Sequence, residues 1–136
     1  IEYNVRMGDP ETQVVLPRIN SDFLELLNSV HTGTLSDFDL KINESSAATV
    51  VMVSGGYPET YEKNMEIKGL DKVKESKVYH AGATKEKGLL KTNGGRVLAV
   101  TSLGENVNKA LEISYRSISE IRFKNQYYRE DIGFDL

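Results

Sequence analysis

Three polar side chains near the start of the chain are of the types that support phosphoryl transfer. Glu2, Asn4 and Arg6 alternate with apolar residues. On an extended strand, alternate side chains point the same way, so these three would share one face. Carboxylate and amide oxygens suit Mg²⁺ bound to nucleotide phosphates, and an arginine holds a phosphate through paired hydrogen bonds. The spacing indicates a phosphoryl-transfer edge, although any half-buried strand with a polar outer face shows the same alternation.

The segment that follows, Gly8-Asp9-Pro10-Glu11, is a turn that carries two carboxylates. An aspartate before a proline commonly starts a turn. Asp9 and Glu11 could position Arg6 or a substrate amine, could pair with Arg6 as a surface ion pair, or could simply cap the turn. The residue types leave these three roles open.

A second candidate site lies at Asn93-Gly94-Gly95-Arg96. Paired glycines let a backbone approach a ligand closely and expose its amide groups to an anion. Arg96 could then hold the anion, with Lys91 as an additional positive charge. Asn-Gly is also one of the strongest signals for a β-hairpin turn, so a purely structural hairpin is the alternative.

Hydrophobic periodicity predicts the elements that must position these residues. Apolar residues at helical spacing favour helices, and short apolar or alternating runs favour strands. We expect a helix N-cap at Asn20 or Ser21, and a capping box formed by Ser102 and Glu105. The predicted strands are residues 1–6, 48–53, 77–81 and 96–101, and the predicted helices are residues 20–31 and 103–121. Strands mixed with few helices indicate an α+β fold in which residues 103–121 form one long helix.

The chain divides into two units on composition. Residues 39–46 are polar and contain serines, which is typical of a connector. We therefore expect one unit over residues 1–38 and a second over residues 47–136. In the second unit, Lys85-Glu86-Lys87-Gly88 has the composition of a hairpin turn.

Size and charge exclude several classes of protein. The chain has 136 residues, enough for a domain with a real core, and its net charge of −3 gives no indication of a nucleic-acid-binding surface. It has no cysteine, which excludes disulfides and thiolate metal sites and agrees with a reducing cytosol. No apolar run approaches the roughly 18–20 residues of a membrane span. Neither a Walker-type loop nor a metal-binding histidine pair is present.

The motif Glu-x-Asn-x-Arg-x-Gly-Asp-Pro-Glu, residues 2–11, resembles the metal-binding strand and signature of the glycinamide ribonucleotide synthetase (phosphoribosylamine–glycine ligase) family. These are ATP-grasp enzymes of purine synthesis. The similarity continues in the same order along the chain, in residues 12–18, 54–58, 78–82, 92–98 and 127–133. This sequence departs from the family at Ala83, where a threonine is usual. Several separated motifs in order are more specific than any one of them.

The resemblance implies a fold and a reaction. Residues 1–38 would be the end of an ATP-grasp module, and residues 47–136 an antiparallel, barrel-like carboxy-terminal domain. The intact cytoplasmic enzyme would use ATP and Mg²⁺ or Mn²⁺ to join glycine to 5-phosphoribosylamine through a glycyl phosphate. Upstream domains of the same polypeptide would be its partners, with no nucleic acid and no membrane involved. Because the chain begins with Ile1 and lacks those domains, we expect a piece of a longer protein that is inactive alone.

The resemblance also implies a role for each candidate residue. Glu2 and Asn4 would bind the metal, and Arg6 would lie near the acyl phosphate. Arg96 would hold the 5-phosphate of the amine substrate, assisted by Gly94, Gly95 and Lys91. The alternatives are another ATP-grasp carboxylate ligase, or a non-catalytic module that docks on a larger ATP-binding domain.

Overall fold

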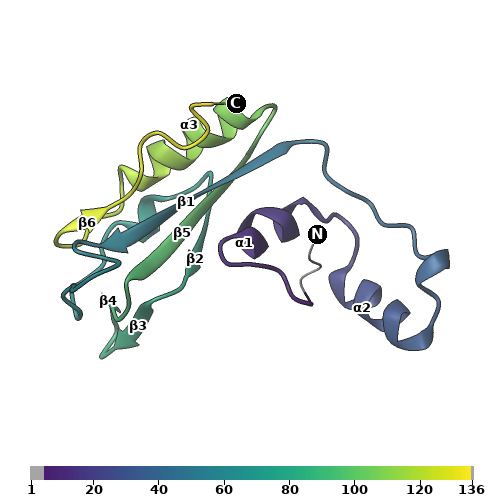
Figure 1. Ribbon diagram of the computed structural model, residues 1–136, viewed down its shortest axis with the longest axis horizontal. Coiled ribbons are helices and arrows are strands. Elements are labelled where there is room, and N and C mark those ends of the chain that lie inside the picture. The colour runs from purple at the N-terminus through teal and green to yellow at the C-terminus, as the bar shows by residue number, and fades with distance from the viewer. Residues whose placement is uncertain (1–4, 136) are drawn as a thin grey trace.

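The computed structural model describes residues 5–135, in which a few helices accompany antiparallel strands (Figure 1). The strand predicted over residues 1–6, with Glu2 and Asn4, falls mostly outside this range. Its two described residues, Val5 and Arg6, form a bend and no strand. The helices are α1 (Glu11–Val15), α2 (Phe23–Thr32) and α3 (Val107–Ile118), with short 3₁₀ helices η1 (Leu16–Arg18), η2 (Leu35–Asp37) and η3 (Leu70–Lys72). The strands are β1 (Ser46–Ser54), β2 (Lys77–His80), β3 (Ala83–Glu86), β4 (Leu89–Thr92), β5 (Arg96–Gly104) and β6 (Gln126–Tyr127).

The main sheet has four strands in the order β2-β5-β1-β6, and every neighbouring pair is antiparallel. Its longest pairing joins β1 to β5, from Ser46 opposite Gly104 to Val53 opposite Arg96. The α+β class with antiparallel strands is therefore confirmed. The expected barrel is not: within residues 5–135 the sheet ends at β2 and at the two-residue β6 and does not close.

One face of this sheet forms the core. Along β1, alternate side chains from Ala48 to Ser54 are buried, and among them Val50 and Met52 have no exposed surface. The helix α3 packs across β1 and β5 on this face and contributes the fully buried Ala110 and Ile118 (Figure 1). Because successive side chains of a strand point to opposite faces, the intervening residues of β1 line the other side. That other side carries the candidate site.

The helix α3 begins later than predicted. The expected start at residue 103, capped by Ser102 with Glu105, is wrong because β5 extends to Gly104 and takes Ser102 into the sheet. The N-cap is Asn106, whose Oδ1 accepts a hydrogen bond from Lys109 N at 2.9 Å. Ser102 instead accepts a hydrogen bond from Ser114 at 2.8 Å, inside the packed interface between sheet and helix.

The helix α2 is capped by Asp22 and not by Asn20 or Ser21 as predicted. Asp22 Oδ1 accepts hydrogen bonds from Leu24 N and Glu25 N, at 2.8 and 3.0 Å. Ser21 is occupied elsewhere, because its Oγ bonds the backbone at Asp39 and Lys41. The tertiary contact between the start of α2 and the connector therefore decides which residue caps the helix.

The predicted hairpin is confirmed between β3 and β4. Its two central residues, Lys87 and Gly88, have φ of 50° and 85°. Positive φ at both positions is typical of the type I′ turn that two-residue hairpins favour. This hairpin forms a separate two-stranded sheet, which leads directly to the segment before β5.

We predict that Asn106→Ala lowers the free energy of unfolding by about 1 kcal/mol, because it removes the N-cap of α3. Urea denaturation of the chain measures this change. Asn106→Asp should retain the cap and most of the stability. Glu105→Ala is the matched control, and a loss equal to that of Asn106→Ala would restore the capping box that the sequence suggested.

Candidate functional site

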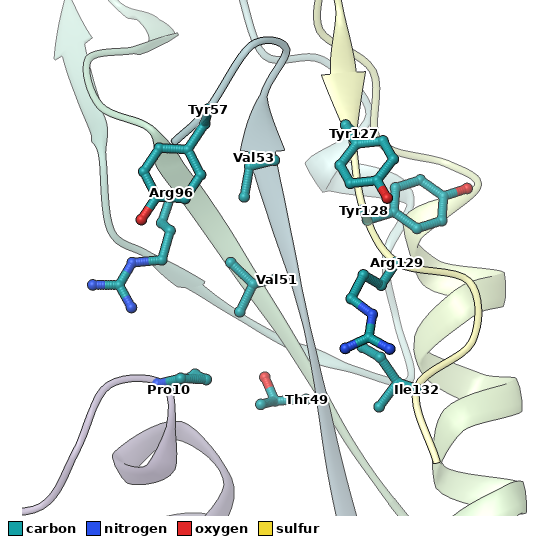
Figure 2. Close-up of a pocket in the computed structure, with 10 residues that line it drawn as sticks. All are labelled: Pro10, Thr49, Val51, Val53, Tyr57, Arg96, Tyr127, Tyr128, Arg129 and Ile132. Carbon is teal, nitrogen blue, oxygen red and sulfur yellow. The ribbon is translucent and has the colours of Figure 1, made fainter. Parts of the chain in front are cut away.

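A pocket of about 390 Å³ lies on the sheet face opposite α3. It brings together the turn before α1, the strands β1 and β5, the loop after β1, and β6 with the tail that follows it (Figure 2). Its lining residues are Pro10, Thr49, Val51, Val53, Tyr57, Arg96, Tyr127, Tyr128, Arg129 and Ile132.

The floor of the pocket is apolar, and its flanks carry two arginines that are each paired with an aspartate. Val51 and Val53 belong to the alternate set of β1 side chains that face away from the core. Figure 2 shows Arg96 on one side of these β1 residues and Arg129 on the other. An apolar floor excludes water and strengthens the attraction of a nearby guanidinium for an anion. The arrangement suits a ligand that carries a negative group.

Arg96 is held by the turn that contains Asp9. Its Nη2 lies 3.1 Å from Asp9 Oδ2, and its Nη1 donates a hydrogen bond of 3.1 Å to the backbone oxygen of Asp9. The two residues are 87 positions apart in the sequence. Both side chains are partly exposed, at 41% and 51%, so the ion pair itself contributes only about 0–1 kcal/mol to stability. Its main consequence is geometric, because it fixes the guanidinium beside the pocket.

The turn around Asp9 is closed by its own side chains. Gly8 N donates to Glu11 Oε2 at 2.7 Å, and Thr12 Oγ1 donates to Gly8 O at 2.8 Å. Gln13 Nε2 donates to Asp9 Oδ1 at 3.0 Å, which leaves Oδ2 directed to Arg96. Glu11 therefore caps the turn, one of the roles that the sequence left open for it. Asp9 connects the turn to the second candidate site.

Arg6 makes no ion pair with Asp9 or Glu11 among the described residues, although the sequence allowed such a pair. It is exposed, and its Nη1 donates to the backbone oxygen of its neighbour Met7 at 3.1 Å. The position of its proposed companions, Glu2 and Asn4, lies outside the described residues. The catalytic role of Arg6 and the metal-binding role of the other two therefore stay predictions.

The two glycines before Arg96 are packed against protein. A Cβ at Gly94 would come 2.9 Å from Gly82 Cα, and a Cβ at Gly95 would overlap the Tyr57 ring. The hairpin interpretation of Asn93-Gly94 is wrong, because β4 pairs with β3 while β5 pairs with β1 and β2. The segment instead crosses between the two sheets. Close backbone packing accounts for both glycines, and their contact with a ligand stays a prediction.

Lys91 lies apart from Arg96. Its Nζ is 3.3 Å from Glu86 Oε2 across the β3–β4 hairpin, and it does not line the pocket. An ion pair with Glu86 uses its charge within the hairpin. The structure therefore brings Arg96 and Asp9 together but leaves Lys91 outside this pocket. The predicted role of Lys91 as an additional positive charge for the anion stays a prediction.

Sequence reasoning missed Arg129 as a pocket residue. It forms a bidentate pair with Asp131, with Nε–Oδ1 at 2.9 Å and Nη2–Oδ2 at 3.0 Å. Hydrogen bonding from Arg129 lowers the pKa of the Asp131 carboxyl, and the same contact raises the pKa of Arg129. Tyr115 Oη donates to Arg129 O at 2.9 Å and ties this tail to α3. The spacing Arg-x-Asp was the available signal, but nothing local showed that the tail folds back to β1.

A metal centre is not visible among the described residues. Within residues 5–135 there is no group of three or more histidine, cysteine, aspartate or glutamate side chains placed to hold an ion. The predicted ligands Glu2 and Asn4 precede that range. No helix in this part of the chain is long and apolar enough to cross a membrane.

Comparisons with known proteins agree on one family. The sequence profile described as phosphoribosylglycinamide synthetase, C domain, matches residues 47–135. The chain is 45% identical to phosphoribosylamine–glycine ligase of Caldanaerobacter subterraneus subsp. tengcongensis over 98% of its own length and 32% of that protein. It is 45% identical to the trifunctional purine biosynthetic protein adenosine-3 of Gallus gallus, over 98% of this chain and 14% of that one.

A solved structure shows the same fold. The crystal structure of phosphoribosylamine–glycine ligase from Thermotoga maritima matches with a TM-score of 0.82 and 33% identity, over 96% of this chain and 32% of that one. The chain thus spans about a third of the length of the single-function ligases that it matches.

We predict that Gly95→Ala lowers the free energy of unfolding by about 1–3 kcal/mol, because its Cβ overpacks the site against the Tyr57 ring. The Tyr57 ring also packs edge-on against the Tyr61 ring, with centroids 6.0 Å apart, so a displacement of Tyr57 by the new Cβ would disturb this second contact. Urea denaturation gives the change. The double variant Gly95→Ala with Tyr57→Ala should lose less than the sum of the single losses, and simple additivity would contradict this packing.

Proposed function

This chain belongs to the phosphoribosylglycinamide synthetase family, and from that premise we propose that it is the carboxy-terminal part of an ATP-dependent ligase. The ligase joins glycine to 5-phosphoribosylamine and forms glycinamide ribonucleotide, ADP and phosphate. The observation that carries this proposal is similarity at 45% identity over 98% of the chain to a phosphoribosylamine–glycine ligase. The proposed setting is the cytoplasm.

The reaction sets an electrostatic problem. A glycine carboxylate oxygen attacks the γ-phosphorus of ATP, the bond to ADP breaks, and glycyl phosphate forms. The amine nitrogen then attacks the carbonyl carbon, the bond to phosphate breaks, and the amine loses a proton. The negative charges of the glycine carboxylate, the ATP phosphates and the acyl phosphate must be neutralised by cations or by oriented N–H groups.

The segment before α1 is proposed to serve the first step. Arg6 would contact the acyl phosphate through its guanidinium. Glu2 and Asn4 supply carboxylate and amide oxygens, which are the donor types that Mg²⁺ or Mn²⁺ takes beside nucleotide phosphates. When bound, the ion would supply positive charge between the phosphates. ATP is the co-substrate in this scheme.

The pocket is proposed to serve the second step. Arg96 would hold the 5-phosphate of phosphoribosylamine, because its guanidinium is fixed beside the pocket and carries N–H donors beyond those that face Asp9. Gly94 and Gly95 would shape the approach to it, with Lys91 as a more distant positive charge. Arg96 is the first residue of β5, where its backbone lies opposite Val53 of β1 and its carbonyl oxygen accepts a hydrogen bond of 2.7 Å from Gly82 N.

Residues 1–38 are proposed to complete an ATP-grasp module, with residues 39–46 as the connector and residues 47–136 as the carboxy-terminal domain. The apolar side of α2 supports this division. Leu24, Leu27 and Val30 are 75%, 52% and 58% exposed, which is unusual for the apolar stripe of an amphipathic helix. Figure 1 shows α2 standing apart from the sheet. Upstream domains of the ligase would cover this stripe.

The same exposed stripe favours a second role for the chain taken alone, as a non-catalytic module that docks on a larger ATP-binding domain and binds nucleotide weakly or not at all. Another ATP-grasp carboxylate ligase is the alternative for the intact enzyme. Release of ADP by the intact enzyme distinguishes the two ligase assignments. We predict that ADP forms with Mg-ATP only when glycine and phosphoribosylamine, generated in situ, are both present. ADP formation on a different carboxylate would remove the purine assignment and leave the ATP-grasp assignment standing.

We predict that Arg96→Ala in the intact ligase raises KM for phosphoribosylamine by about 10- to 100-fold, the cost of losing charge-assisted hydrogen bonds. KM for glycine should change little. Steady-state kinetics with each substrate varied in turn gives both constants. Arg116→Ala is the matched control, because Arg116 is also half-exposed and ion-paired but lies outside the pocket. An effect of Arg96→Ala on glycine alone would refute the phosphate role.

A further inference from the structure

We propose that Asp9 is a positioning residue for the amine substrate, and that it acts by orienting Arg96. This inference rests on the proposed role of Arg96 in binding the 5-phosphate. It adds that the Gly8–Glu11 turn, which directly follows the Arg6 segment, determines where that phosphate binds. The two halves of the site are then aligned by one contact.

The contact restrains the guanidinium at two of its nitrogens. Nη2 faces the Asp9 carboxylate, and Nη1 donates to the Asp9 backbone oxygen, each at 3.1 Å. A planar group held at two terminal nitrogens has a defined orientation. Nη1 gives an N–H to the Asp9 backbone and Nη2 faces the Asp9 carboxylate, so the N–H groups that do not point to Asp9 are the donors left for an anion.

The contact is also the polar link between the two proposed units, beside the packing of α1 against β1 and β5. Among the hydrogen bonds and ion pairs of residues 5–135, those of Arg96 with Asp9 join residues before 39 to residues after 46. The carboxylate is itself held, because Gln13 Nε2 donates to its other oxygen at 3.0 Å. A displacement of the turn would therefore displace the guanidinium of Arg96.

Stability does not account for this arrangement. Both side chains are partly exposed, and ion pairs of that kind contribute little to folding. Arg116 with Glu75 is a comparable pair on another surface, with a distance of 2.8 Å and side chains 51% and 60% exposed. What distinguishes Arg96 and Asp9 is that Arg96 and the neighbouring Pro10 both line the pocket.

The test compares Asp9→Asn with Glu75→Gln in the intact ligase. We expect Asp9→Asn to raise KM for phosphoribosylamine about tenfold, the effect of weakening one charge-assisted contact to the positioned arginine. KM for glycine and kcat should change little. Glu75→Gln should leave all three constants unchanged. Equal KM values for the amine in wild type and Asp9→Asn would overturn the positioning role.

Double substitution shows whether Asp9 acts through Arg96. If it does, Asp9→Ala adds no further loss to Arg96→Ala, because the residue to be oriented is absent. Full additivity would overturn the inference. If Arg96→Ala alone leaves KM for the amine unchanged, the phosphate assignment itself fails. A normal Asp9→Asn beside an impaired Arg96→Ala refutes only the positioning role.

The charge-reversed pair separates positioning from folding. Asp9→Arg with Arg96→Asp restores an ion pair but places the guanidinium on the turn. Because the pair contributes only about 0–1 kcal/mol to stability, we expect its Tm to stay close to that of wild type while KM for the amine is raised. A KM for the amine at the wild-type value would show that the pair serves only to hold the turn on the domain.

Discussion

The antiparallel pairing of β1 with β5 is the constraint on which the rest of the structure depends. It aligns nine-residue strands and presents one face of β1 to α3. Because side chains alternate between faces, the same pairing that buries Val50 and Met52 turns Val51 and Val53 toward the pocket. A shift of one residue would exchange the core for the site. Burial under α3 holds the register and so also holds the floor of the pocket.

The pocket illustrates how a site can be built from short, separate segments. The turn before α1, the start of β5 and the tail after β6 meet only because the sheet provides a common surface. Each segment is held by a specific contact. Glu11 accepts a hydrogen bond that closes the turn, and the Tyr57 ring packs beside Gly95. The Tyr115 hydroxyl donates a hydrogen bond to the backbone oxygen of Arg129. Two arginines then stand on opposite sides of an apolar floor.

The apolar side of α2 is exposed, although the helix is locally well formed. The helix has an N-cap at Asp22 and ends at Gly33, which adopts the left-handed conformation typical of a helix end. Its apolar stripe nevertheless faces solvent. A helix of this kind gains its stability from tertiary packing more than from propensity. The chain spans 32% of the related ligase from Caldanaerobacter subterraneus, and we propose that another part of such a ligase covers this stripe.

The sequence by itself determined the α+β class, the hairpin at Lys87-Gly88, the presence of helices near residues 20–31 and 103–121, and the family. These are recorded in local spacing or in the order of motifs. It also singled out Arg96 and Asp9, but as members of separate sites. Only the tertiary structure showed that these two residues pair and that Arg129 lies across the pocket from Arg96. It also showed that the sheet of the described residues does not close into a barrel and that Asn106 caps α3. The physical reason is that such contacts join residues as far as 87 positions apart, and their partners are chosen by packing and strand pairing, which local patterns do not record.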